Sequence, residues 1–261
     1  MPLSAVRPSR PRIHSVPVRE WLDALERRHM ADLTFQEIVR ALRALSSCYV
    51  ERRAKLAGGG ALDSRGKRAA FALFYGPLHL ILTRHIIRAL ADPATRGVAE
   101  ITDLGCGTGV AGAAWALESG SARLHGSDRN AWAVTEANWT YRALGLNGHA
   151  VARDVARTRL PSTPQSAILL AYVVNELSEE DRENLADALK AAQAGGTRVL
   201  VIEPIARRVA PWWRRWEEIF TSRGGRGDEW RFPSDLPQRQ KELARAAGLD
   251  PRELTARALF M

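Results

Sequence analysis

The sequence ITDLGCGTG, residues 101–109, decides the fold of this chain. Apolar and β-branched residues lead into Asp103, three glycines follow at alternate positions, and a helical pattern begins at Val110. This order predicts a buried strand, a tight glycine turn and a helix N-terminus. Such a junction brings bare backbone close to a ligand and directs unpaired helix N–H groups at it. We therefore expect the ligand site of the protein at this loop.

Short apolar runs and helical patterns alternate along the chain after residue 96, which predicts a parallel sheet. The fold class that we expect is α/β, with a doubly wound, mostly parallel, Rossmann-like sheet. Strands are expected at residues 100–104, 123–127, 148–153, 167–173, 197–202 and 254–260, and helices at 110–118, 130–144, 178–195 and 238–247. The glycines at 224 and 225 and the polar run to Pro237 are expected to form a loop.

The chain divides into three predicted parts. Residues 1–16 are expected to be a basic flexible arm, because four prolines at positions 2, 8, 11 and 17 oppose helix there. Residues 17–95 have helical periodicity and form a predicted helical subdomain, in which Pro77 should bend or divide one long helix. Residues 96–261 form the domain that carries the glycine loop.

Composition limits the class of protein. The chain has 261 residues, 46% of them hydrophobic, and a formal net charge of +9. The basic balance favours an anionic partner, nucleic acid before a membrane surface. Two basic clusters stand on neighbouring predicted helices, and they form either one phosphate-binding face or ordinary solvated surface. These clusters are Arg52, Arg53 and Lys55, and Arg65, Lys67 and Arg68.

The two cysteines, Cys48 and Cys106, indicate a reduced intracellular setting, and we expect a cytoplasmic protein with no metal site. Cys106 lies between two loop glycines and is interpreted as a small residue in a tight turn rather than a nucleophile. We expect no membrane span. An apolar stripe of tryptophans from Trp212 to Trp216 is interpreted as core, although stacking on RNA bases is an alternative.

Three acids follow predicted strands and bear on the ligand. The loop also fits a dinucleotide fingerprint through Gly112, so a nicotinamide or flavin cofactor competes. Asp103 would repel an anionic pyrophosphate but attract the cationic sulfonium and amino groups of S-adenosylmethionine. Asp128 is placed to accept from the ribose hydroxyls of either ligand, and Asp154 from the adenine amino group. The three acids together favour S-adenosylmethionine.

These residues resemble the first motif and the two cofactor acids of Rossmann-fold methyltransferases, over residues 98–205. The resemblance implies a class I, S-adenosylmethionine-dependent methyltransferase domain preceded by a helical subdomain. The cofactor-binding residues that we predict are Asp103, Gly105, Cys106, Gly107, Gly109, Asp128, Arg129, Asp154 and Val155.

A narrower resemblance is to the methyltransferase-like proteins of the small ribosomal subunit, a family of bacteria and mitochondria linked to ribosome assembly. It rests on AYVVNEL at 171–177, VIEP at 201–204 and the aromatic segment with a proline at 68–77. It implies RNA, and the ribosomal small subunit in particular, as the partner. Where that family has a tryptophan–cysteine motif, residues 228–232 read DEWRF, so no iron–sulfur site is predicted.

The acceptor side is predicted to follow the fourth strand. Tyr172 and Asn175 are the candidate catalytic residues, with Glu176 beside them, and Asn175 would orient an acceptor through its amide unless it is a helix cap. The Asn-Pro-Pro-aromatic motif of amino-group methyltransferases is missing, so the acceptor atom is not assigned. Three functions stay open: an RNA methyltransferase with ribosomal RNA favoured, a non-catalytic cofactor-binding assembly factor, and a small-molecule or protein methyltransferase.

Overall fold

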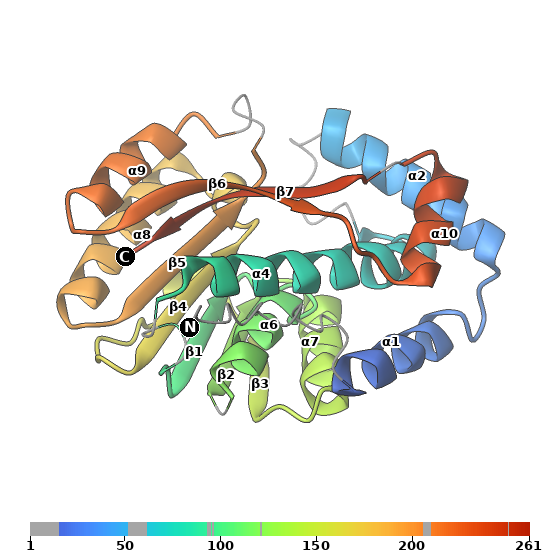
Figure 1. Ribbon diagram of the computed structural model, residues 1–261, viewed down its shortest axis with the longest axis horizontal. Helices are drawn as coiled ribbons and strands as arrows, with labels where there is room; N and C mark the ends of the chain where they lie inside the picture. The colour runs from blue at the N-terminus through green and yellow to red at the C-terminus, as the bar shows by residue number, and fades with distance from the viewer. Residues whose placement is uncertain are drawn as a thin grey trace, which may run out of the picture.

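The computed structural model describes residues 16–51, 62–92, 95, 97–120, 122–205, 210–249 and 251–261. One sheet runs through the molecule, with helices on both of its faces and the N-terminal helices stacked at one end (Figure 1). Residues 1–15 of the predicted basic arm lie outside the described residues. Arg52, Arg53 and Lys55 of the first basic cluster also lie outside them.

The N-terminal region is helical, as predicted, and strands and helices alternate after it. The helices are α1 (Val16–His29), α2 (Phe35–Glu51), α3 (Arg65–Ala70), the π-helical turn η3 (Phe71–Tyr75), α4 (Gly76–Leu90), α6 (Val110–Ser119), α7 (Ala131–Ala143), α8 (Glu179–Ala194), α9 (Trp213–Thr221) and α10 (Gln238–Ala247), with short turns η4 (Val155–Arg157) and η5 (Val174–Glu176). The strands are β1 (Glu100–Leu104), β2 (Arg123–Asp128), β3 (Gly148–Ala152), β4 (Ser166–Ala171), β5 (Arg198–Glu203), β6 (Arg226–Pro233) and β7 (Glu253–Phe260).

The sheet has the order β3-β2-β1-β4-β5-β7-β6. Strands β1 to β5 are parallel, and β7 enters antiparallel between β5 and β6. The predicted α/β, mostly parallel sheet is therefore confirmed. The dinucleotide-binding order is 3-2-1-4-5-6, without an antiparallel strand in that place. The topology thus argues against the competing nicotinamide interpretation.

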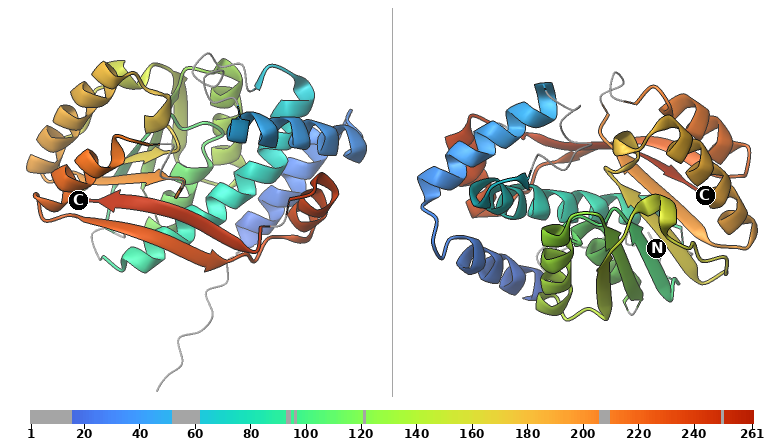
Figure 2. Two further views of the ribbon diagram at one scale, coloured as in Figure 1. Left: turned by 90° about the horizontal axis from the view of Figure 1, so that it is seen from above. Right: turned by 180° about the vertical axis from the view of Figure 1, so that it is seen from behind.

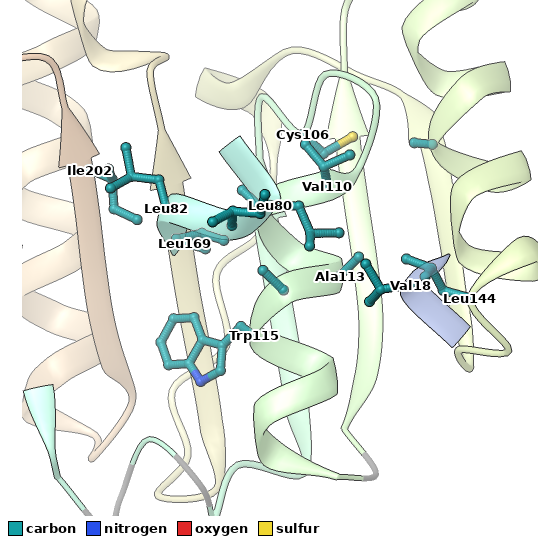
Figure 3. Close-up of a cluster of buried hydrophobic side chains, with 14 of the residues drawn as sticks. Val18, Leu80, Leu82, Cys106, Val110, Ala113, Trp115, Leu144, Leu169 and Ile202 are labelled. Atoms are coloured by element: carbon teal, nitrogen blue, oxygen red, sulfur yellow. The ribbon is translucent and has the colours of Figure 1, made fainter. Parts of the chain in front are cut away.

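Strand β5 shows how the sheet divides the interior. Leu200 and Ile202 belong to a core shared with α4 and α6, whereas Val199 and Val201 belong to a second core with α8 and α9. Successive side chains of a strand point to opposite faces, so a strand covered on both faces is apolar throughout. Figure 2 shows the two helical layers, and Figure 3 shows Leu82 of α4 in the first core.

The tryptophan stripe on α9 lies in the second core. Trp213 and Trp216 are 8% and 2% exposed, so the predicted core role is confirmed for both. Arg214 and Arg215 point to the solvent, where they pair with Glu218 and with Glu183 of α8.

Caps fix where helices begin. Thr34 and Glu37 form a reciprocal capping box: Glu37 N–H donates to Thr34 Oγ1 at 3.3 Å, and Thr34 N–H donates to Glu37 Oε2 at 2.8 Å. These two contacts fix the start of α2. Ser178 caps α8 by accepting from the N–H of Asp181 at 3.0 Å, and its own hydroxyl donates to Asp181 Oδ2 at 2.7 Å.

Pro77 lies near the start of α4, directly after the π-helical turn, and it does not break the long helix. A proline inside a helix has no N–H to donate, so it leaves the carbonyl four residues earlier without its usual partner. That carbonyl belongs to Leu73, in the π-helical turn, and Gln240 of α10 donates to it through Nε2 at 2.9 Å. The helix continues instead of breaking, and α10 docks on the released carbonyl.

One helical run, Arg65–Leu90, has the length and composition of a membrane span, which differs from our expectation of none. Its most apolar window is 72% buried inside the protein, as in the core helix of a globular fold. Leu80 and Ile86 of this run are fully buried in the first core.

The predicted loop over residues 226–233 is wrong, because these residues form strand β6. They read RGDEWRFP, a polar sequence in which most residues keep some exposure. Within the described parts of the chain, β6 pairs with β7 alone and lies at the edge of the sheet, where charged side chains remain in water. The polar composition therefore gave no signal for a strand that forms because it pairs with β7.

Candidate active site

The glycine loop has the conformation that its sequence predicts. Gly105, Gly107 and Gly109 all have positive φ, at 66°, 52° and 78°, which other residues rarely adopt. A Cβ on Gly105 would lie 2.3 Å from Val173 Cγ2, and one on Gly109 would lie 2.6 Å from Tyr141 Cε1. A Cβ on Gly107 would meet no atom of the described residues within 4 Å. The loop is therefore closed against the protein at its two ends and open in the middle.

Asp103 lies beneath the loop rather than in front of it. Its side chain is 1% exposed, and Oδ2 accepts from the N–H of Gly112 in the first turns of α6 at 3.0 Å. Burial raises the pKa of Asp103 to about 7, against the effect of that hydrogen bond, and the charge of Asp128 raises it further. Asp103 thus ties β1 to α6, and its contact with the donor stays a prediction.

Asp128 holds the open part of the loop from the end of β2. Its Oδ2 accepts from the N–H of Gly107 at 2.9 Å, and its Oδ1 accepts from the N–H of Asn130 at 2.8 Å. Asn130 in turn caps α7. One half-buried carboxylate therefore sets both the loop and the start of the next helix.

The remaining predicted cofactor residues follow β2 and β3. Arg129 is exposed beside Asp128. Asp154 is half-buried and caps the turn η4, since its Oδ1 accepts from the N–H of Ala156 at 2.9 Å. Val155 is 6% exposed and packs in the second core. The structure thus brings Asp103, Asp128 and Asp154 to the carboxyl ends of neighbouring strands, while their contacts with a cofactor stay predictions.

Cys106 is a structural residue of the loop. It is 6% exposed, and its N–H donates to Ser127 O at 2.9 Å. Burial, and then the charges of Asp103 and Asp128, raise the pKa of its thiol well above the usual value. A thiol that resists ionisation is a poor nucleophile, in agreement with its interpretation as a small turn residue.

The residues after β4 form two different environments. Tyr172 is half-buried and its ring stacks on His79 of α4, with centroids 4.2 Å apart. Asn175 lies in η5, where Nδ2 donates to Glu203 Oε2 at 2.5 Å and Oδ1 accepts from Trp212 Nε1 at 2.9 Å. Glu176 is exposed. The amide of Asn175 therefore binds within the protein, and its predicted role toward an acceptor stays untested.

Sequence reasoning missed Glu203, the residue on which Asn175 depends. Glu203 ends β5, is 0% exposed, and its Oε1 accepts from the N–H of Val174 at 3.0 Å. Its register partner on β7 is Arg257, which lies over the ring of Trp213 at 4.1 Å. The sequence signal for its role is that Glu203 ends an apolar strand. A buried carboxylate at such a position is costly unless it has a hydrogen-bonding or charged partner.

Stability should fall as the pH rises, because Glu203 is buried. Burial raises its pKa from 4.5 to about 8, although hydrogen bonds from Val174 and Asn175 and the charge of Arg257 oppose the shift. The folded state therefore binds the proton more tightly, so the contribution is full below pH 4.5 and is lost as the pH rises toward 8. Urea unfolding of wild type and Glu203→Gln at several pH values measures it. An equally steep decline in Glu203→Gln would contradict this cause.

The residues present fit S-adenosylmethionine. Asp103 Oδ1 is buried and has no hydrogen-bond partner among the residues that the structure describes, so an acceptor remains under the loop. Gly107 faces open space, and Asp128 and Asp154 place negative charge at the ends of β2 and β3. A cationic donor is attracted by such a site, whereas a pyrophosphate is not. When bound, the donor would be held by these residues.

The open space at Gly107 gives a matched test. Gly107→Ala and Gly145→Ala both place a side chain at positive φ in open space, so each should cost about 1–2 kcal/mol of stability. Only the first adds a methyl group to the loop, so only it should weaken S-adenosylmethionine binding, by about tenfold or more. Isothermal titration and urea unfolding measure the two effects. Equal affinities of the two variants would show that the ligand does not approach Gly107.

The family model described as Methyltransferase small domain matches residues 82–168. The match contains the glycine loop and all three acids, and it ends before the segments at 171–177 and 201–204. It confirms the predicted enzyme class, an S-adenosylmethionine-dependent methyltransferase, and with it the predicted cofactor. Among curated proteins none matches this chain in sequence.

Solved structures with a similar fold include several methyltransferases. Magnesium protoporphyrin IX methyltransferase from Synechocystis, with bound S-adenosylmethionine, is 13% identical and covers 70% of this chain and 78% of its own, with a TM-score of 0.45. A TehB-like S-adenosylmethionine-dependent methyltransferase from Corynebacterium glutamicum is 20% identical and covers 84% and 98%, with a TM-score of 0.44. At identities this low, the similarity describes the fold and not the substrate.

Within the part of the chain that the structure describes, no three His, Cys, Asp or Glu side chains gather as a metal site. Two histidines of α4 pack on aromatic rings, His79 on Tyr172 and His85 on Phe232.

Proposed function

We propose that this protein transfers a methyl group from S-adenosylmethionine to RNA, with ribosomal RNA of the small subunit as the favoured acceptor. The observation that carries the choice of RNA is a basic rim beside the site. Four exposed arginines follow the ends of β2 and β3 on either side of Asp128 and Asp154, and the chain has a net charge of +9. These are Arg129, Arg153, Arg157 and Arg159. Guanidinium groups in this position suit a phosphate backbone.

The helical clusters give weaker support. Arg65 forms an ion pair with Asp32, and Lys67 pairs with Asp63 at 2.9 Å, so acids offset both charges. Arg68 donates to Leu62 O at 2.9 Å. The described half of the predicted phosphate-binding face is therefore largely compensated, and the rim beside Asp128 is the better candidate.

The chain's own task in the reaction is positioning. When bound, S-adenosylmethionine would supply an electrophilic methyl group on a cationic sulfur, which is a good leaving group. Gly105 and Gly109 fix the loop against the protein, and Asp128 holds it at Gly107. Alignment of the two reactants supplies much of the rate in such a displacement.

The experiment is labelled methyl transfer from S-adenosylmethionine to separated RNA, protein and metabolite pools. We expect label in RNA, and binding to ribosomal RNA that weakens steeply with salt. The double variant Arg153→Glu/Arg157→Glu should reduce the slope of log K against log salt by about 0.7 for each phosphate that the variant no longer binds. Arg214→Glu, on a 91% exposed side chain of α9, is the control. Label confined to metabolites, or a flat salt response, would contradict the proposal.

A second function, RNA binding in small-subunit assembly without methyl transfer, is supported by one observation. Both polar atoms of the Asn175 amide bind Glu203 and Trp212, so the candidate acceptor-orienting group is occupied within the protein. The same assay separates the two functions. Tight binding of both cofactor and ribosomal RNA without label in any pool would favour this second function.

A further inference from the structure

Four aromatic rings meet beyond the end of β4 and form what we call the aromatic cluster: Phe71, Tyr75, His79 and Tyr172. His79 stacks on Tyr172 with centroids 4.2 Å apart and an angle of 21°. Tyr75 and Phe71 approach the same imidazole at 6.0 Å and 6.4 Å. All four residues are half-buried, so the cluster keeps surface open to a ligand.

The aromatic cluster lies at the same end of the sheet as the glycine loop. β1 and β4 are paired with Leu104 opposite Leu170, so the residues that follow the two strands leave the sheet together. Val173, next to Tyr172, packs against Gly105, and a Cβ on Gly76 would lie 3.8 Å from Val110 Cγ1. The segments that carry the rings therefore contact both ends of the loop that is predicted to hold the methyl donor.

The backbone of the cluster is unusual on both sides. Tyr172 has φ 63°, in the left-handed region that residues with a bulky side chain avoid, and its N–H donates to Ile202 O at 2.9 Å. Phe71 and Tyr75 begin and end the π-helical turn. Strained residues and π-helical turns both concentrate at functional sites, where the surrounding structure holds them in place.

The imidazole in the cluster is uncharged. Burial lowers the pKa of His79 to about 4, so the ring is neutral at physiological pH. Its surroundings are aromatic, and a flat neutral ring among other flat rings offers a surface for stacking rather than a site for an ion.

We propose that the aromatic cluster stacks on the target nucleobase of the RNA and holds it beside the methyl donor. This inference rests on the proposed function. Every nucleobase has an aromatic face, and stacking on aromatic side chains is how proteins bind single-stranded RNA. The basic rim then contacts phosphates while the cluster contacts the base. The proposal assigns Phe71, Tyr75, His79 and Tyr172 to acceptor binding.

The test compares two RNA probes in the presence of S-adenosylmethionine: a single-stranded hexauridylate and an abasic ribose-phosphate hexamer of the same charge. The ratio of their dissociation constants isolates the contribution of the bases from that of the phosphates. From the known strength of base–aromatic stacking, we expect the wild type to prefer the first probe by about 5- to 100-fold.

The helix α4 provides a matched pair of variants. His79→Leu should bring the ratio close to one. His85 is on the same helix, α4, but stacks on Phe232 of β6, so His85→Leu should leave the ratio unchanged. Tyr172→Leu should also abolish the preference, and Tyr172→Phe, which keeps a ring, should retain it. The affinity for S-adenosylmethionine and the melting temperature show whether each variant is folded.

The outcomes separate this inference from the proposed function. Loss of the preference in His79→Leu and Tyr172→Leu, with folded proteins and normal cofactor affinity, supports the cluster as the base site. If the wild type labels RNA but His79→Leu keeps the full preference, the cluster proposal is overturned and the proposed function stands. If the wild type binds neither probe and labels only metabolites, both are overturned.

Discussion

Asp128→Ala should weaken S-adenosylmethionine binding by about 10- to 100-fold. The carboxylate accepts from the N–H groups of Gly107 and Asn130, so its removal frees the open part of the glycine loop and the start of α7. Hydrogen bonds to a charged group contribute roughly 1.5–3 kcal/mol, which corresponds to that range of affinity. The predicted hydrogen bonds from the ribose would disappear at the same time. Thermal-shift titration with S-adenosylmethionine and with NAD(H) measures the effect.

Two further variants control this result. Asp187→Ala removes an equal charge from a 73% exposed side chain on α8 and should leave the affinity unchanged. Asp128→Asn keeps one acceptor oxygen and should fall between wild type and Asp128→Ala. Stabilisation of the wild type by NAD(H) alone would contradict the cofactor, and normal affinity of Asp128→Ala would contradict the role of this carboxylate.

Glu136→Leu should cost about 3 kcal/mol of the free energy of unfolding. Glu136 of α7 is 0% exposed, and its carboxylate accepts from His29 Nε2 at 2.7 Å and from Arg28 at 3.2 Å. These partners belong to α1, so one buried acid joins the N-terminal helices to the sheet domain. Removal of the acid leaves Arg28 and His29 without their carboxylate partner. Arg28 is 38% exposed and can regain water, which limits the loss to the lower part of the known range.

The same variant has a pH signature. Burial raises the pKa of Glu136, but the hydrogen bonds and charges of His29 and Arg28 outweigh burial, and the pKa is lowered from 4.5. A lowered pKa gives stability that is present above pH 4.5 and is lost as the pH falls. Urea unfolding at pH 7 and pH 4 should therefore show a smaller difference between wild type and variant at pH 4.

Glu26→Leu is the matched control for the contact of α1. Glu26 pairs with Arg239 of α10, but both side chains are about one-third exposed, at 32% and 34%. Exposed ion pairs contribute less than about 1 kcal/mol. A loss in Glu26→Leu as large as that in Glu136→Leu would show that burial is not the reason for the difference.

The sequence predicted the sheet well because its signals are local. Strands β4 and β5 are short apolar runs, and an acid or a turn follows the strands at the loop side of the sheet. Ser178 and Thr34 mark helix starts through contacts within three residues. The placement of Asp103, Asp128 and Asp154 followed from the same logic, since the carboxyl ends of parallel strands share one edge. These features need no knowledge of distant partners.

The rest depends on contacts between distant residues. His79 and Tyr172 stack although 92 residues separate them along the chain. Asn175 faces a buried acid 28 residues away, and neither residue by itself indicates the other. Strand β6 failed for the same reason, because a polar edge strand is defined by the strand beside it. Hydrophobic periodicity and capping motifs do not indicate which distant residues contact one another.

The position of β7 also has a consequence for the order of folding. During synthesis β1 to β5 emerge first, and the inner edge of β5 stays without a partner until residues 253–260 arrive to pair with it. An exposed apolar strand edge is a template for aggregation. Strand β7 follows β6 in the chain but lies between β5 and β6, so the last strand to be added is an interior strand of the sheet. The final eight-residue strand therefore protects the nascent chain as well as completing the sheet.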